Sequence, residues 1–385
     1  DRTFFEPTLL TLEELGVKRI YDLSGIRGLF KLIRLMKQEQ FDIVHTYLFS
    51  ENILGVIAAR IAGTPVVITS RRDTGMLREG KWQHILAYKI TNMWVNKIIC
   101  VSNAVRDIAR KKENIPDDKL VTIYNGVDIN KFNKHRDRSA ARNSLGIKQG
   151  EYTVGMFANF SWIKGHKDFI DAAKIVLKNI PDTKFLLIGD GLLKGRFEEY
   201  VRQNKLQDAV IFLGKRNDIP QLLSAMDVTV NASYSEGMSN TILESMAAET
   251  PVVATAVDGN LETVIHGETG ILVPPHTPEL MAEAVINILK DKTLAQKMSE
   301  NGRKRAVDAF SAARMILDME CLYKQILKPK VAFIFSQFPC YDETFIMREM
   351  SQLKKEGLNF AIYSIKPCKD RIIHNDAKEL AKNVR

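Results

Sequence analysis

Short apolar runs alternate with segments of helical periodicity along most of the chain. Residues 28–38 and 50–62 repeat apolar positions every three or four residues, which is typical of amphipathic helices. The apolar runs predict strands at 41–45, 65–68, 97–101, 120–123, 153–158, 185–188, 210–213, 228–230 and 252–254. This βαβ alternation predicts an α/β protein with parallel, doubly wound sheets.

A polar stretch at 130–150 interrupts the alternation, which then starts again. We therefore expect two Rossmann-like domains, at 1–140 and 141–312, followed by a closing helix at 313–330. Ligands of doubly wound sheets bind at the carboxyl ends of the strands. The expected site therefore lies in the cleft between the two domains.

The two ends of the chain do not fit this simple division. Residues 11–16 and 17–21 predict a helix and a short strand, so the opening strands of the first domain are missing from its start. Residues 331–385 predict an additional strand, helix and strand, at 331–335, 343–356 and 360–364. This tail either supplies the missing strands or begins a second, truncated module. Under the first hypothesis, residues 331–335 pair centrally in the sheet of the first domain.

Composition limits the class of protein. The chain has 385 residues and is 45 % hydrophobic, enough for two domains with their own cores. Its four cysteines include no CxxC pair, so neither a disulfide framework nor a zinc site is indicated, and a reducing, cytoplasmic setting fits. No apolar run approaches the roughly 18 to 20 residues that a membrane-spanning helix needs.

The positive charge lies entirely in the first part of the chain. Residues 1–150 hold 25 Lys and Arg against 16 Asp and Glu, whereas the remainder holds 30 of each. Such a basic half suits an anionic partner such as a membrane surface, or is simply a solvated basic face. Two basic amphipathic segments, 27–37 and 78–97, could lie on an anionic membrane, the second with Trp82 and Trp94. No basic and aromatic recognition motif accompanies the charge, so nucleic-acid binding is not expected.

Residues 236–244 form the most informative motif. They read Glu-Gly-Met-Ser-Asn-Thr-Ile-Leu-Glu, between a predicted strand and a predicted helix. Free amides and the helix dipole at such a helix start favour an anion. The carboxylates of Glu236 and Glu244 suit hydroxyl-rich groups, and Asn240 is expected to cap the helix. The motif therefore predicts a nucleotide diphosphate sugar as ligand.

Eight segments in order resemble the GT-B retaining glycosyltransferases of family 4, also called glycosyl transferases group 1. The matching segments are 41–45, 63–67, 100–105, 123–128, 155–158 with 164–166, 188–191, 236–244 and 267–270. The resemblance covers roughly residues 1–330 and implies the GT-B fold. Residues 331–366 resemble the beginning of the same family.

The resemblance implies roles for the residues on the donor side. Glu236 would contact the donor sugar and Glu244 the ribose, and Lys164 would neutralise the departing diphosphate. The remaining donor-binding candidates are Gly165, Gly189, Gly191, Gly237, Met238, Ser239 and Asn240. Asn159 stands where the family usually has an arginine, and Arg216 is a candidate to compensate for the lost charge.

On the acceptor side the chain departs from the family. A histidine often follows the second predicted strand, but Ser70, Arg71, Arg72 and Asp73 stand there. His45, at the end of the preceding strand, is a candidate catalytic residue. Arg71 is a second candidate, because arginines at a strand end suit a phosphate.

The resemblance implies a retaining transferase that moves a hexose-type sugar to a hydroxyl of a glycan or lipid-linked acceptor. It would act in polysaccharide or glycolipid synthesis, without metal or other cofactor, in the cytoplasm or peripherally on the inner face of the membrane. Two alternatives remain open. One is a nucleotide-sugar epimerase of the same fold, and the other is a non-catalytic partner of a second transferase.

Overall fold

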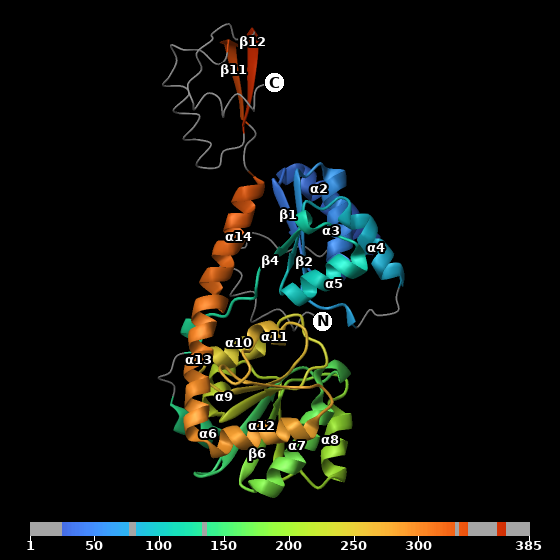
Figure 1. The fold of residues 1–385 in the computed structure, drawn as a ribbon. Coiled ribbons are helices and arrows are strands. Elements are labelled where there is room, and N and C mark those ends of the chain that lie inside the picture. Colours follow the sequence, from blue (N-terminus) through green and yellow to red (C-terminus); the bar gives the residue numbers. More distant parts are fainter. Residues whose placement is uncertain (1–24, 77–81, 133–136, 328–330, 338–359, 367–385) are drawn as a thin grey trace. The chain divides into compact units, whose positions relative to one another are not determined.

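The computed structural model describes residues 25–76, 82–132, 137–327, 331–337 and 360–366. By its contacts the chain divides into two compact units, Asp1–Asp318 and Met319–Arg385. The first unit contains two parallel sheets, and the second contains a separate pair of strands (Figure 1).

The first sheet has four parallel strands in the order β1-β2-β3-β4. Its strands and helices follow each other as α2 (Gly25–Glu39), β1 (Ile43–Thr46), α3 (Phe49–Ala62), β2 (Val66–Arg71), α4 (Trp82–Asn92), β3 (Lys97–Cys100), α5 (Asn103–Glu113) and β4 (Leu120–Thr122). Every side chain of β2 is buried, because a central strand of a parallel sheet is covered on both faces.

The second sheet has six parallel strands in the order β10-β9-β8-β5-β6-β7. Its elements are α6 (Arg138–Ser144), β5 (Tyr152–Phe157), α7 (His166–Asn179), β6 (Thr183–Ile188), α8 (Lys194–Gln203), β7 (Val210–Gly214), α9 (Ile219–Ala225), β8 (Val228–Asn231), α10 (Asn240–Ala247), β9 (Val252–Thr255), α11 (Asn260–Thr263), β10 (Ile271–Val273), α12 (Pro278–Lys290), α13 (Lys292–Phe310) and α14 (Ala312–Ile326). The strand order doubles back at β5 and β8, which makes this sheet doubly wound.

The predicted α/β fold with two parallel sheets is therefore confirmed. All nine strands predicted between residues 41 and 254 are present, with ends that differ by at most three residues. The pattern did not reveal β10 (Ile271–Val273), a strand of three residues.

The tail forms its own small sheet. Strand β11 (Val331–Gln337) pairs in parallel with β12 (Phe360–Lys366), from Val331 opposite Phe360 to Gln337 opposite Lys366. In the described part of the chain β11 belongs to this two-stranded sheet, and its central position in the sheet of the first domain stays a prediction. The predicted elements at 11–16, 17–21 and 343–356 lie outside the described residues.

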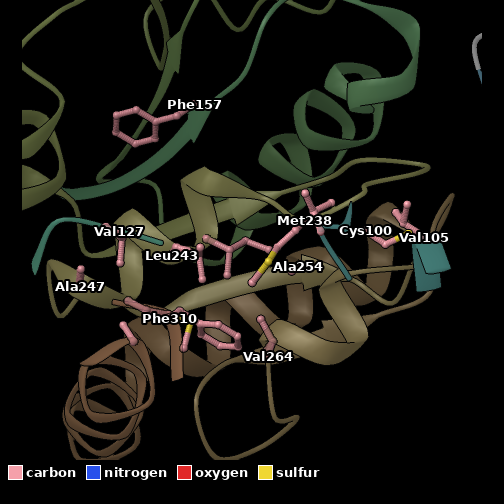
Figure 2. Packing of buried hydrophobic residues seen from close by; sticks show 14 of the residues in the cluster. Cys100, Val105, Val127, Phe157, Met238, Leu243, Ala247, Ala254, Val264 and Phe310 are labelled. Atoms are coloured by element: carbon pink, nitrogen blue, oxygen red, sulfur yellow. The ribbon is translucent and has the colours of Figure 1, made fainter. Parts of the chain in front are cut away.

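A cluster of buried apolar side chains lies beneath the loop that precedes α10. Met238 belongs to this loop and packs in the same cluster as Leu243 and Ala254 (Figure 2). Burying Met238 anchors the middle of the loop, because apolar side chains gain free energy on leaving water. Among the described helices none is both long and apolar enough to cross a membrane.

Candidate donor site

The loop between β8 and α10 has the geometry of an anion site. Ser239 is the N-cap of α10, and its hydroxyl accepts a hydrogen bond from the amide of Ile242 at 3.4 Å. The prediction of Asn240 as the cap was wrong by one residue. Both residue types cap helices well, so the sequence alone could not choose between them.

The backbone amides at the start of α10 are available to a ligand. Within the described residues, the N–H groups of Gly237, Met238, Ser239 and Asn240 donate no hydrogen bond to the protein. Four consecutive unpaired donors at a helix start, together with the helix dipole, favour a phosphate group.

A second loop, after β9, holds this one in place. The carboxylate of Asp258 accepts a hydrogen bond from the hydroxyl of Ser235 at 2.6 Å and from the amide of Glu236 at 3.1 Å. The amide of Gly259 donates to the carbonyl of Glu236 at 3.0 Å. Sequence reasoning missed Asp258, because nothing in its own segment marks it as a partner of residues more than twenty positions earlier.

Lys164 and Glu236 meet in the structure, as the sequence predicted for residues of one site. The Lys164 Nζ lies 2.6 Å from a Glu236 carboxylate oxygen, and both side chains are mostly buried. An ammonium group has three donors, so this contact leaves others for a phosphate.

Gly165 explains how Lys164 reaches this position. The residue has a φ of +68°, and a Cβ there would lie 2.0 Å from the carbonyl oxygen of Ala232. The backbone therefore passes directly over the end of β8. A further hydrogen bond, from the amide of Tyr234 to the carbonyl of Ile163 at 2.7 Å, fixes the two loops together.

Glu244 lies on α10, partly buried. Burial raises the pKa of its carboxyl group. No hydrogen bond or ion pair to its side chain is found within the described part of the chain. A carboxylate that loses water without gaining a protein partner is costly, and ligand hydroxyl groups would compensate that cost.

The other predicted donor residues lie on neighbouring loops. Gly189 and Gly191 lie against the backbone of Ala158 and Phe160, so a Cβ at either position would clash. Asn159 is exposed on the loop between these contacts. Arg216 forms a bidentate ion pair with Asp218: its Nε donates to Oδ1 at 2.8 Å and its Nη2 to Oδ2 at 2.5 Å. The charge of Arg216 is therefore already paired.

His45 lies at the end of β1 among polar groups of the first sheet. Its Nε2 is 2.8 Å from the Ser70 hydroxyl, and its ring stacks on Tyr47 at 4.3 Å between centroids. Burial, and then the nearby Arg72 guanidinium, lower the pKa of His45 to about 4. The imidazole is therefore neutral near pH 7, as a proton acceptor must be.

Arg71 lies in a buried network. Its guanidinium pairs with Glu113 at 3.0 Å, donates to Asn92 at 2.8 Å and stacks on the Tyr88 ring at 3.7 Å. The nearby charges, above all Glu113, outweigh burial and raise the pKa of this guanidinium. The catalytic role of Arg71 stays a prediction. The next residue, Arg72, is exposed.

Residues that follow two strands of the first sheet, β2 and β4, contact the donor loop directly. The Thr74 and Ser235 hydroxyls are 2.6 Å apart, and Asn125 donates to the side chain of Asn240 at 2.9 Å. Neither contact was foreseen, because each joins residues more than one hundred positions apart.

Two parallel α/β sheets, with a phosphate-type helix start and two carboxylates beside it, are typical of the proteins that bind nucleotide sugars. Comparison with known proteins agrees. Residues 17–131 match the model described as Glycosyltransferase Family 4, and residues 137–305 match the one described as Glycosyl transferases group 1.

Two curated relatives point to the same family. The chain is 32 % identical to the UDP-Gal:alpha-D-GlcNAc-diphosphoundecaprenol alpha-1,3-galactosyltransferase of Escherichia coli, over 84 % of this chain and 83 % of that protein. It is 27 % identical to the N-acetyl-alpha-D-glucosaminyl L-malate synthase of Bacillus anthracis, over 77 % and 78 %. The crystal structure of Anabaena Alr3699/HepE in complex with UDP-glucose is similar in fold, with a TM-score of 0.76 at 23 % identity over 83 % and 89 %.

The chain belongs to glycosyltransferase family 4, the group 1 glycosyltransferases, and has the GT-B fold of that family.

Proposed function

We propose that the chain transfers a hexose from a nucleotide diphosphate sugar to a hydroxyl of a glycan or lipid-linked acceptor, with retention of configuration. The observation that carries this proposal is the grouping of Lys164, Glu236 and four unpaired amides around one helix start. The E. coli relative, named for UDP-galactose and a diphosphoundecaprenol acceptor, makes UDP-hexoses the first donors to test.

In this proposal, the positive groups and amides bind the diphosphate and the carboxylates bind hydroxyl groups. The amides of Gly237 to Asn240 and the ammonium of Lys164 stabilise the negative charge that grows on the leaving diphosphate. Glu236 accepts hydrogen bonds from hydroxyls of the donor sugar, and Glu244 from those of the ribose. The acceptor hydroxyl loses its proton to the leaving phosphate on the same face of the sugar.

We further propose that this chemistry needs no bound metal, because Lys164 and the amides supply the positive charge. Polysaccharide or glycolipid synthesis on the cytoplasmic side of a membrane is the proposed setting. The free thiols of Cys100 and Cys321 suit a reducing compartment.

The test is transfer by the purified chain, first with a panel of UDP-hexoses. Lys164→Ala should lower kcat by about 100-fold to 1,000-fold, the usual effect of removing one donor to a developing oxyanion. Lys167→Ala is the matched control. Lys167 lies three residues after Lys164, is exposed and pairs with Asp171. Chelators should leave the rate unchanged. Equal turnover by the Lys164→Ala and Lys167→Ala variants would reject the assignment.

A further inference from the structure

Helices α7 and α8 lie side by side in the domain of the six-stranded sheet (Figure 1), and a cavity opens between them. Its volume is about 530 Å³, within the range of roughly 300–1,000 Å³ that small-molecule sites occupy. We call this cavity the Trp162 pocket; its walls include Trp162, His166, Arg196, Phe197, Tyr200 and Tyr234. Of the described residues proposed to bind the donor, Gly165 alone lines it.

Stacked rings support one wall of the pocket. The centroid of the His166 ring lies 4.4 Å from that of Phe160 and 5.2 Å from that of Phe197. Burial lowers the pKa of His166 to about 4, so the imidazole is uncharged at neutral pH. A wall of neutral, closely packed rings exists before any ligand arrives, which lowers the cost of binding.

Trp162 extends this aromatic wall to the protein surface. Its side chain is half exposed. Within the described residues its indole N–H donates no hydrogen bond and its ring stacks on no other ring. A ligand that covers this ring removes apolar surface from water, which is favourable. Tyr200 and Tyr234 add two further rings to the lining.

The polar groups of the pocket carry both signs of charge. Arg196 is exposed, and in the described part of the chain its guanidinium forms no ion pair or hydrogen bond. Lys167 is already paired with Asp171 at 2.6 Å. A Glu199 carboxylate oxygen accepts a hydrogen bond from the amide of Gln203 at 3.1 Å. This mixed set supplies donors and acceptors for hydroxyl groups, without the concentration of positive charge that a diphosphate needs.

The pocket and the donor site share one turn of backbone. Trp162 and Lys164 both belong to the 3-10 helix η5 (Trp162–Lys164). Such a helix has three residues per turn, so side chains two positions apart leave its axis in different directions. Lys164 reaches Glu236 on the donor loop, whereas Trp162 lines the pocket. A molecule that spans this turn extends from the pocket to the donor sugar.

Aromatic walls with mixed polar groups fit the two surfaces of a pyranose ring. The C–H groups on the face of the sugar are apolar and slightly positive, so they pack on the electron-rich faces of aromatic rings. The hydroxyl groups at its edge accept hydrogen bonds from guanidinium or indole N–H groups and donate to carboxylate oxygens. An alkyl chain would leave these polar groups unused.

We propose that the Trp162 pocket binds a pyranose residue of the acceptor glycan, one or more sugars away from the hydroxyl that receives the hexose. This inference deepens the proposed function and rests on it, since it assigns a second contact for the same acceptor. An acceptor of several sugars binds more tightly than a single sugar, because two linked contacts reinforce each other.

An array of immobilised oligosaccharides, built from hexoses and N-acetylhexosamines, tests the proposal with the full chain and without donor. The chain should bind at least one of them. Trp162→Ala should weaken that binding about 10-fold or more, since the stacking surface is lost. Trp162→Phe should keep most of the affinity, because an aromatic ring remains. Arg196→Ala should cost about threefold to 10-fold, the usual effect of one hydrogen bond.

Trp82→Ala is the matched control. Trp82 lies on α4 and is 66 % exposed, against 50 % for Trp162. This variant should bind oligosaccharides like the unmodified chain. Equal binding by the two alanine variants overturns the proposal, and so does failure of the unmodified chain to bind any oligosaccharide on the array. Displacement of the bound oligosaccharide by saturating UDP also overturns it, because that result assigns the pocket to the donor.

Failure of this inference can be told from failure of the proposed function. Binding on the array needs no transfer, so Lys164→Ala should lose transfer and still bind the same oligosaccharides. If Lys164→Ala transfers normally, the proposed function fails, and the array result still decides the pocket. With an acceptor that contains the bound oligosaccharide, Trp162→Ala should raise KM and leave kcat within about twofold. A lower kcat at unchanged KM contradicts a binding role.

Discussion

At the residue scale, Glu244 shows how a side chain proposed to bind the donor can destabilise the fold that carries it. Its carboxyl group is partly buried, and desolvation raises its pKa. A raised pKa in the folded state means that the native protein prefers the protonated form. Deprotonation at neutral pH therefore lowers the free energy of unfolding.

Replacing Glu244 with Gln should separate stability from binding. We expect a higher Tm at pH 7 and above, with the difference shrinking as the pH falls into the ordinary range of a glutamate. Donor affinity should fall about 10-fold to 100-fold, since a charged acceptor of hydrogen bonds is lost. Thermal melts across pH and donor titrations measure the two effects.

Glu283→Gln is the control, because Glu283 is exposed on α12. This change should alter neither the Tm nor the donor affinity. A Glu244→Gln variant that binds donor normally would contradict the ribose role. In the unmodified chain, donor affinity should weaken as the pH is lowered. The loss should begin at a higher pH than the protonation of an ordinary glutamate, because the pKa of Glu244 is raised.

The sequence could bring two distant residues together where the resemblance to the family marks both. Lys164 and Glu236 lie 72 positions apart, and the structure brings their side chains into contact, while their roles stay predictions. Asp258 and Thr74 were not predictable, because their roles depend on which loops the fold brings together. For Arg71 the sequence shows two adjacent arginines, but only the structure shows that Arg71 is buried and Arg72 exposed.

At the element scale, the β5–α7 loop depends on close backbone packing. Gly165 combines a positive φ with a backbone oxygen only 2.0 Å from where a Cβ would lie. Another residue type there must push Lys164 away from Glu236 or move the end of β8.

Gly165→Ala should therefore lower the free energy of unfolding by at least about 2 kcal/mol. Transfer should fall as well, because Lys164 is displaced. Gly195→Ala is the matched control: Gly195 lies in α8 with nothing within 4 Å of its Cβ position. That change should stabilise the protein by about 0.5–1 kcal/mol. Denaturant melts that show equal effects for the two variants would contradict this account.

Whole elements were more predictable than their partners. Alternation of apolar runs located nine of the ten strands of the two large sheets, since buried parallel strands are nearly continuous in apolar residues. Pairing was harder: β11 has the same pattern as a central strand, yet it pairs with β12. A strand's composition reports its burial and carries no information on which neighbour buries it.

At the scale of the whole molecule, the tail has a sheet of its own, formed by β11 and β12. The segments that match the two family descriptions end at residue 305, well before β11. Both strands belong to the second compact unit, Met319–Arg385.

Removal of residues 328–385 should therefore leave the transfer rate within about twofold of that of the full chain. The Tm of the main unfolding transition should not change. Activity assays and calorimetry of the shortened chain beside the full chain check this. Loss of folding would instead show that the tail completes the first domain, as the permutation hypothesis requires.

The Lys164–Glu236 pair has a consequence for how fast a donor arrives. Opposite charges 2.6 Å apart cancel at distances beyond a few ångströms, so this pair contributes little long-range field. The pair itself therefore adds little to the steering of an anionic nucleotide toward the loop. The salt dependence of donor association should then come from the remaining charge of the chain, which is +9 in total.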